Sequence, residues 1–372
     1  MENLKDNGLV TLRRKVLEKE FSKMNDRQRE AVFSVNGPLL ILAGAGSGKT
    51  TVLVNRIANI VRYGNAYESK DGGGGLSAAE LDNIYNFLDG SGTLLPEVRD
   101  RLASGRCSAW NILAITFTNK AADELKKRLS DLLGEDGRNV RASTFHSACS
   151  RMLRRYAERI GYKAHFTVYS ADDSKRVMKE CQKQLGIDDK ILPCKSILSA
   201  VSRAKDSMTG PDEYILQAGT DSRMADIGRA YKLYQSKLRS ADAMDFDDLI
   251  YNTVALLQNN PDILEYYNEK FKYVLVDEYQ DTSHAQYLLI KLLSQKSRNL
   301  CVVGDDDQSI YGFRGATIEN ILGFEKTFPD AKVIRLEQNY RSTKKILQAA
   351  NAVIANNKSR KGKTLWTDNP AG

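Results

Sequence analysis

Short, largely apolar segments recur along the chain, and each is followed by a turn or by a helical pattern. They occupy residues 39–42, 112–117, 140–145, 273–277, 300–305 and 332–336. Apolar runs of this length are typical of strands that are buried on both faces. Because helical patterns separate them, we predict an α/β fold built on a doubly wound, parallel sheet. Ligands of such a sheet collect at the carboxyl ends of its strands.

The segments between the strands carry apolar residues at helical spacing, as in Thr51–Ile57 and 121–133. From 156 to 241 the pattern is almost wholly helical, and this stretch holds more Lys and Arg than Asp and Glu. We therefore expect a modestly basic helical domain there. It would be inserted into a sheet domain made of residues 1–155 and 242–340.

Residues 64–108 interrupt the alternation. Four consecutive glycines, Gly72–Gly75, predict a flexible tether, and Ser77 with Glu80 has the sequence pattern of a helix-capping box. Apolar residues at helical spacing follow, and a second short helix is expected from Pro96 to Ala103. We interpret the segment as an inserted helical hairpin. The alternative is a surface decoration without chemistry.

The first strand runs into a glycine-rich turn and then into a helix. The turn reads Ala43-Gly44-Ala45-Gly46-Ser47-Gly48-Lys49-Thr50, with Thr51 next. Glycines let backbone N–H groups close around phosphate oxygens, and the helix N-terminus adds partial positive charge. Lys49 would reach the β- and γ-phosphates, and the Thr50 hydroxyl would ligate Mg²⁺. Ala43 departs from the usual first glycine but is also small. The pattern predicts a site for ATP and Mg²⁺.

Two later strand ends carry acidic and amide side chains. The strand 273–277 ends in Asp277, which we expect to hold Mg²⁺ directly or through water, and Glu278 could accept a proton from attacking water. Gln308 follows the next strand and could contact the γ-phosphate. The alternatives are a strand end with two solvated acids and, around Gln308, an acidic turn.

The composition bears on the charge of a ligand and on the redox state of the compartment. The net charge of +8 permits a polyanionic ligand. The five cysteines lack C-x-x-C spacing, so we expect buried thiols in a reducing cytoplasm and no metal set. No apolar run approaches the roughly 18 residues of a membrane span, and the N-terminus lacks the apolar core of a signal peptide.

Seven segments, taken in order, resemble the sequence motifs of the UvrD/PcrA/Rep-type superfamily 1 DNA helicases, from about residue 21 to the C-terminus apart from 64–108. They are Gln28 with Ala31-Val32, 43–50, 115–122, 143–146, 277–281, 304–315 and 338–342. The resemblance implies a RecA-like motor domain, with 341–372 beginning a second one. It implies an ATP-driven enzyme of DNA repair or replication that moves 3′ to 5′ on single-stranded DNA and meets single-strand/double-strand junctions.

The same resemblance implies roles for individual residues. Gln28 would read the adenine, Arg56 and Tyr340 would flank the base, and Arg341 would reach the γ-phosphate. Gln308 would couple the nucleotide to the DNA side. The DNA contacts would come from Thr116, Phe117, Asn119, Ser143, Thr144, His146, Tyr311, Phe313 and Arg314.

Four aromatic residues fall just after strand ends: Phe117, Phe145, Tyr311 and Phe313. Aromatic faces that stack on bases, with cations nearby for phosphates, are how sequence-neutral grooves hold single strands. The alternative for each ring is that it caps the hydrophobic core. Phe313 stands where the family often has Trp, so its stacking surface is smaller.

The family's remaining motifs, which include a second arginine for the γ-phosphate, have no counterpart in the 372 residues. We therefore expect an N-terminal half that binds ATP but turns it over slowly. Two other readings remain open: the motor part of a helicase–nuclease subunit, and a nucleotide-binding module without turnover.

Overall fold

A six-stranded sheet forms the centre of the computed structural model, which describes residues 2–71, 75–312, 315–357 and 360–372. The strand order is β3-β2-β6-β7-β1-β8, and neighbouring strands are parallel. The strands are β1 (Leu39–Ala43), β2 (Ile112–Thr116), β3 (Arg141–Thr144), β6 (Tyr273–Val276), β7 (Leu300–Gly304) and β8 (Lys332–Leu336). The predicted parallel sheet is confirmed. The strand predicted over 140–145 is shorter, because Phe145 already begins a helix.

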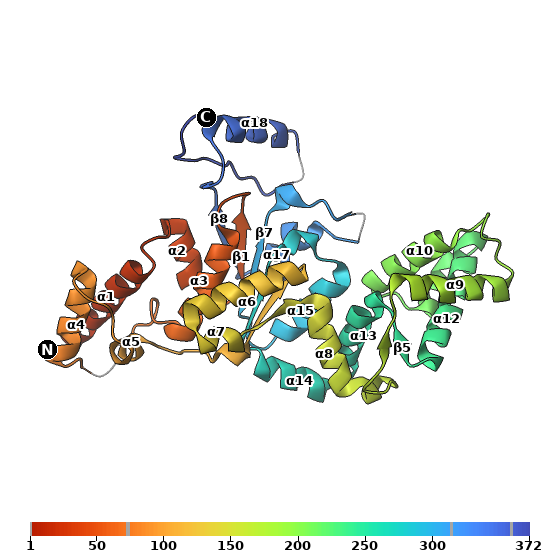
Figure 1. The fold of residues 1–372 in the computed structure, drawn as a ribbon, viewed down its shortest axis with the longest axis horizontal. Helices are drawn as coiled ribbons and strands as arrows, with labels where there is room; N and C mark the ends of the chain where they lie inside the picture. Colours follow the sequence, from red (N-terminus) through yellow and green to blue (C-terminus); the bar gives the residue numbers. More distant parts are fainter. Residues whose placement is uncertain (1, 72–74, 313–314, 358–359) are drawn as a thin grey trace.

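Helices cover both faces of the sheet, as the doubly wound prediction requires (Figure 1). Odd-numbered residues of β1, such as Ile41, pack on one face, and Leu40 and Leu42 pack on the other. The first face carries α2 (Asp26–Phe33), α3 (Lys49–Arg62), α6 (Asn119–Leu133) and α7 (Glu135–Asn139). The second carries α8 (Phe145–Tyr156), α13 (Phe246–Asn259), α14 (Pro261–Lys270), α15 (His284–Ser294), α16 (Glu319–Leu322) and α17 (Phe324–Thr327).

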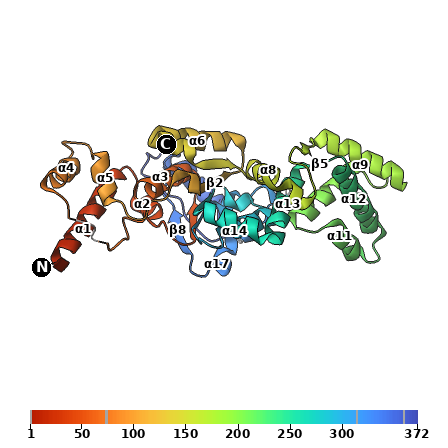
Figure 2. The ribbon, with the colours of Figure 1, turned by 90° about the horizontal axis from the view of Figure 1, so that it is seen from below.

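A separate helical unit projects from one end of the molecule (Figures 1 and 2). It consists of α9 (Ala171–Leu185), α10 (Cys194–Asp206), α11 (Pro211–Ala218) and α12 (Ser222–Ser240), which share their own hydrophobic cluster. The chain enters and leaves this unit beside a small parallel sheet of β4 (Thr167–Val168) and β5 (Ala243–Met244). Tyr162 and Phe166 pack in the hydrophobic cluster of the sheet domain, and the cluster of the helical unit is formed by later residues.

A buried ion-pair cluster joins the helical unit to the sheet domain. The Lys205 ammonium on α10 lies 2.7 Å from Asp245 and 2.9 Å from Asp248, at the start of α13. Lys205 is 1% exposed, so its buried charge is stable only beside counter-charges such as these carboxylates. The cluster fixes how α10 meets α13.

The inserted hairpin lies at the opposite end, packed on the N-terminal helix (Figure 2). Helix α1 (Glu2–Glu20) contributes Val16 to a small apolar cluster, and α4 (Ala78–Asp89) contributes Ile84. Helix α5 (Pro96–Leu102) adds Val98 and Leu102. The capping box of Ser77 and Glu80 is confirmed. Of the predicted tether, residues 72–74 lie outside the described residues.

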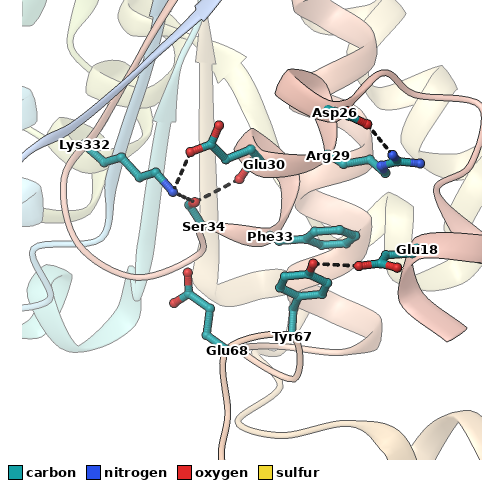
Figure 3. A pocket seen from close by; sticks show the side chains of 9 residues that line it. All are labelled: Glu18, Asp26, Arg29, Glu30, Phe33, Ser34, Tyr67, Glu68 and Lys332. Atoms are coloured by element: carbon teal, nitrogen blue, oxygen red, sulfur yellow. Dashed lines mark hydrogen bonds and ion pairs between the residues drawn. The ribbon is translucent and has the colours of Figure 1, made fainter. Parts of the chain in front are cut away.

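A pocket of about 310 Å³ marks the junction between the hairpin's first residues and the sheet domain (Figure 3). Phe33 and Tyr67 stack there with ring centroids 4.1 Å apart, and the Tyr67 hydroxyl donates to Glu18. Lys332, at the start of β8, pairs with Glu30 across the pocket. Because it lies at the amino end of β8, this pocket is remote from the strand ends where ligands are expected.

The chain ends in helix α18 (Lys344–Ile354) and an extended segment that returns to the sheet domain (Figure 1). Gln338 and Trp366 form an isolated parallel bridge, in which the Asn339 backbone donates to the Trp366 carbonyl. We call residues 360–367 the C-terminal strap. All five cysteines are free and buried, as predicted. Within the described residues, no helix has the length and apolar character of a membrane span.

Candidate functional site

The predicted strand, turn and helix lie in one phosphate-binding geometry. Strand β1 ends at Ala43 and α3 begins at Lys49. Gly46 and Gly48 have φ of 69° and 83°, which side-chain-bearing residues rarely adopt. The Ser47 hydroxyl donates to the Gly44 carbonyl at 2.7 Å and closes the turn on itself. The turn therefore needs glycine for its shape, and it ends at the positive end of a helix.

The lysine of the turn faces the acidic strand end of β6. The Lys49 ammonium lies 3.0 Å from Glu278, so β1 and β6 bring the two predicted catalytic groups together. Burial and the neighbouring Glu278 charge raise the pKa of Asp277 to about 6. The same two causes raise the pKa of Asp281 to about 6. Three acids thus crowd around one ammonium group.

This crowding fits a divalent cation. Asp277 is 9% exposed, and one of its carboxylate oxygens accepts a hydrogen bond from the Glu278 backbone, which leaves lone pairs for a ligand. Thr50 follows Lys49 in the first turn of α3 and carries a hydroxyl group. Oxygen ligands of this kind suit Mg²⁺, and its charge would offset the repulsion that raises the acid pKa values.

Gln280 connects this acid cluster to the next strand, and sequence reasoning missed it. Its side chain is 1% exposed and donates to Glu278 at 3.0 Å, while its carbonyl accepts from the Asp305 backbone at 2.9 Å. Gln308 in turn donates to the Asp305 carboxylate. The two predicted groups Glu278 and Gln308 are therefore linked through Gln280 and Asp305.

The segment after β8 lies over the phosphate-binding turn. The Asn339 amide donates to the Ala45 carbonyl at 2.6 Å, and the Tyr340 backbone donates to the Gly46 carbonyl at 3.0 Å. A Cβ atom on Gly46 would come within 2.9 Å of the Arg341 Cβ, so Arg341 stands beside the turn. Arg341 and the half-exposed Tyr340 therefore lie beside the phosphate-binding turn, and their contact with a nucleotide stays a prediction.

Arg56 and Gln28 were both predicted to contact the base, and both already make hydrogen bonds within the protein. Arg56 is 1% exposed, and its guanidinium donates to the carbonyls of Ala31 and Val35 at 2.6 and 3.1 Å. The prediction that Arg56 flanks the base is wrong, because this side chain ties α3 to the end of α2 inside the core. The exposed residue at the start of α3 is Thr51.

Gln28 is close to the turn but its amide is already engaged. It donates to the Ser47 carbonyl at 2.9 Å and accepts from the Asn25 backbone at 3.1 Å. It thereby caps its own helix and braces the phosphate-binding turn. Adenine recognition by Gln28 stays a prediction, since a base would have to displace one of these bonds.

The residues predicted to contact DNA divide into buried and accessible groups. Thr116, Ser143 and Thr144 are at most 7% exposed, and their hydroxyls bond within the protein. The structure therefore gives them a role in shaping the ends of β2 and β3. Asn119 is exposed at the start of α6, and Phe117 stacks against Tyr311 with centroids 6.1 Å apart. Phe313 and Arg314 lie outside the described residues.

His146 is half-buried at the start of α8, where its ring lies 4.6 Å from that of Phe246. Burial lowers the pKa of His146 to about 4, so the ring is neutral at pH 7. Phe246 is 56% exposed at the start of α13, and sequence reasoning missed it because no periodic pattern marks it. Phe145, by contrast, is 2% exposed and belongs to the core, so its predicted stacking role is wrong.

A second pocket, of about 190 Å³, opens between α8 and α14 beside the edge strand β3. Four cations line it: Arg141, Arg151, Arg155 and Lys270. Within the part of the chain that the structure describes, none of them pairs with a carboxylate. Arg151 also donates to Ser143 at 2.9 Å. This pocket favours an anionic ligand.

Comparison with known proteins agrees with this geometry. Residues 24–70 and 91–329 match the UvrD/REP helicase N-terminal domain, and 334–372 match the UvrD-like helicase C-terminal domain. The ATP-dependent DNA helicase PcrA of Staphylococcus epidermidis is 47% identical over 349 residues, which are 94% of this chain and 42% of that protein. The PcrA proteins of Bacillus subtilis and Staphylococcus aureus are 45% and 46% identical, again over 42% of their length.

The chain therefore spans less than half the length of these relatives. The match to the N-terminal domain covers most of the chain, including the phosphate-binding turn and the acids that follow β6. The parallel sheet with its phosphate-binding turn is the RecA-like motor fold. On these grounds the chain belongs to the UvrD/REP helicase family.

Proposed function

We propose that this chain is the nucleotide-binding part of an ATP-driven DNA helicase that moves along single-stranded DNA. The observation that carries the proposal is the Lys49–Glu278 ion pair of 3.0 Å on the phosphate-binding turn. Phosphate oxygens compete with Glu278 for the Lys49 ammonium. When Lys49 turns to them, Glu278 is released to accept a proton from attacking water.

Other residues of the site take complementary roles in this proposal. Thr50 and Asp277 hold Mg²⁺, which neutralises charge on the phosphates when it is bound. Gln308 contacts the γ-phosphate, and Arg341 stabilises the charge that spreads over its oxygens. Tyr340 stacks on the base in the half-exposed position that the structure gives it.

The DNA strand would run across the carboxyl ends of β2 and β3. Phe117 with Tyr311, and His146 with Phe246, present paired rings there, as sequence-neutral binding of a single strand requires. Movement from 3′ to 5′ and contact with single-strand/double-strand junctions rest on the family resemblance, and a cytoplasmic location rests on the reduced cysteines.

We propose that residues 1–155 and 242–340 act as the first motor domain, 156–241 as a helical accessory domain, and 341–372 as the start of a second motor domain. Phosphoryl transfer also needs positive charge from the wall facing the turn, and Arg341 is the one candidate among the described residues. The second arginine that the family resemblance implies has no counterpart in the 372 residues. The lack of such an arginine slows turnover by roughly 10³–10⁵. The 372-residue chain should therefore bind ATP well and hydrolyse it slowly.

Calorimetry with ATP and Mg²⁺ tests the site. Lys49→Ala should weaken binding at least about 100-fold, because charge-assisted bonds to the phosphates are lost. Lys126→Ala, an exposed lysine of α6 that pairs with Asp123, is the matched control and should bind like the parent. Equal affinity in the Lys49→Ala variant and the parent would refute the proposal.

Steady-state phosphate release tests the motor assignment. The chain is compared, with and without oligo-dT, with a version extended through a complete UvrD-like C-terminal domain. Only the extended version should be strongly stimulated by DNA. If the 372 residues turn over within about tenfold of the extended version, the arginine argument fails and the site is complete without a second domain.

A further inference from the structure

Three consecutive carboxylates at the end of β7 surround one buried ammonium group. Lys363 of the C-terminal strap lies 2.6 Å from Asp305, 2.5 Å from Asp306 and 2.8 Å from Asp307. Lys363 is 7% exposed as a residue, and its side chain is 2% exposed. The three carboxylates could in principle surround a metal ion. In this structure the lysine occupies the centre, so the protein supplies the counter-charge itself.

The cluster depends on the lysine. Burial raises the pKa of the Asp306 carboxyl, but the hydrogen bonds from Lys363 and from the Lys361 backbone lower it below the usual value. A buried charge without a partner is strongly destabilising. Arg360 also pairs with Asp307, at 2.7 Å. Removal of Lys363 would take away the one ammonium group that Asp305, Asp306 and Asp307 share, and would weaken the hold on the turn Asp305–Gln308.

The strap also contacts the phosphate-binding turn. A Cβ atom on Gly44 would come within 2.1 Å of the Leu365 side chain, so Leu365 packs directly on that glycine. The Asn339 backbone donates to the Trp366 carbonyl at 2.7 Å, and Asn339 itself holds Ala45. The strap thus contacts the turn, the Asn339 segment and the acidic end of β7 at once.

Asp305 connects Lys363 to the rest of the site. One of its carboxylate oxygens is bound by Lys363, and the other accepts from the Gln308 amide. Its backbone N–H donates to Gln280, which donates to Glu278. Through Asp305, Lys363 is two hydrogen bonds from the group proposed to contact the γ-phosphate.

We propose that Lys363 is a positioning residue for ATP recognition: it holds the Asp305–Gln308 turn so that Gln308 meets the γ-phosphate. The inference rests on the proposed function, because it assigns a partner to the same site. The inference goes beyond the proposed function because it assigns the control of γ-phosphate recognition to the C-terminal strap. The strap follows the predicted site residues in the chain.

The test compares ATP with ADP, since only ATP carries the γ-phosphate. Lys363→Met keeps the length of the side chain and removes its charge. We expect its affinity for Mg²⁺–ATP to fall about tenfold, as for the loss of one hydrogen bond to a charged group, and its affinity for Mg²⁺–ADP to change less than about twofold. Lys361→Met, which removes the ion pair with Glu325 in the same strap, is the matched control and should leave both affinities unchanged.

A double variant separates positioning from general support. If Lys363 acts through Gln308, Lys363→Met combined with Gln308→Ala should lose no more ATP affinity than the larger single change. Additive losses would overturn the inference. So would an equal fall in ATP and ADP affinity, or no fall in either.

A milder variant covers the case in which Lys363→Met does not fold. Asp307→Asn weakens one of the three contacts and should lower the preference for ATP over ADP about threefold, as partial loss of a charged hydrogen bond predicts. An unchanged preference in this variant overturns the inference. If the parent chain itself fails to bind ATP, the proposed function is refuted instead, so the two failures are distinguishable.

Discussion

The side-chain amide of Asn339 donates a hydrogen bond of 2.6 Å to the carbonyl of Ala45. The Asn339 side-chain oxygen Oδ1 accepts from the Arg341 and Ser342 backbones at 2.8 and 2.7 Å. One 2%-exposed side chain thus sets the turn that presents Arg341 and fastens this turn to the phosphate-binding loop. Asn339 and Ala45, which are 294 positions apart in the chain, are brought together in this way.

Asn339→Ala should release the segment that carries Tyr340 and Arg341. We expect Mg²⁺–ATP affinity to fall about tenfold, because buried hydrogen bonds are lost and the backbone groups they satisfied remain. Calorimetry measures the affinity, and hydrogen exchange should show faster exchange of the Arg341 and Ser342 amides. Asn369→Ala is the control, since Asn369 bonds to Ser342 and not to the loop. Equal losses in both variants would contradict the assignment.

Phe246→Ala should weaken the binding of single-stranded DNA. Loss of one stacked base corresponds to about 1–3 kcal/mol. The salt dependence should hardly change, because no phosphate contact is removed. Trp110→Ala is the matched control: Trp110 is similarly exposed, at 53%, but precedes β2 at the amino edge of the sheet. Fluorescence anisotropy with oligo-dT checks both, and equal affinity of the Phe246 variant and the parent would place the strand elsewhere.

Acid should destabilise the parent through His146. The folded chain keeps this ring neutral down to about pH 4, while an unfolded histidine takes a proton near its ordinary pKa of 6.5. The unfolded state therefore binds more protons between these values, and the contribution to stability is lost as pH falls through this window. Linkage gives a loss of up to about 2 kcal/mol between pH 7 and 5.

Urea unfolding at several pH values measures this effect. His146→Gln should remove this contribution to the pH dependence of the unfolding free energy. The altered packing changes the unfolding free energy by the same amount at each pH, so it does not affect this dependence. His165→Gln, which replaces an exposed histidine, is the control variant. An unaltered slope in the His146 variant would show that the ring titrates like an exposed histidine.

Ile84→Ala should loosen the hairpin without touching the nucleotide site. Ile84 is fully buried, and its cluster with Val16 and Leu102 is separate from both clusters that flank the sheet. Truncation of a buried isoleucine costs about 2–5 kcal/mol. Hydrogen exchange should therefore rise in α1, α4 and α5, while Mg²⁺–ATP affinity stays as in the parent. A loss of ATP affinity would mean that the hairpin supports the main core.

Much of the sheet and of the phosphate-binding turn could be read from the sequence. Leu39–Leu42 is apolar at every position because the strand is buried on both faces, and Gly46 and Gly48 are required by their positive φ. Such features depend on residues close together in the chain. The capping box of Ser77 and Glu80 is predictable for the same reason.

Burial and distant pairing were decided by the tertiary structure. Arg56 and Phe145 have residue types that suit a ligand site, yet packing of α3 against α2, and of α8 against the sheet, places both inside the core. Nothing near Phe246 in the sequence shows that it will meet His146, since most of α8 and the whole helical unit separate them in the chain. Residue type alone does not distinguish an arginine or a phenylalanine that the fold buries from one that it leaves exposed.

The sequence by itself determined the strands, the glycine-rich turn and the acids that follow β6, because local sterics and hydrophobic periodicity specify them. Only the tertiary structure decided which of these groups meet. Lys363 and Asp305 lie 58 positions apart in the chain, and no local pattern pairs a lysine with one acid rather than another. Their contact forms because the returning strap buries the lysine where three carboxylates already converge, and a buried ammonium group is stable only beside its counter-charges.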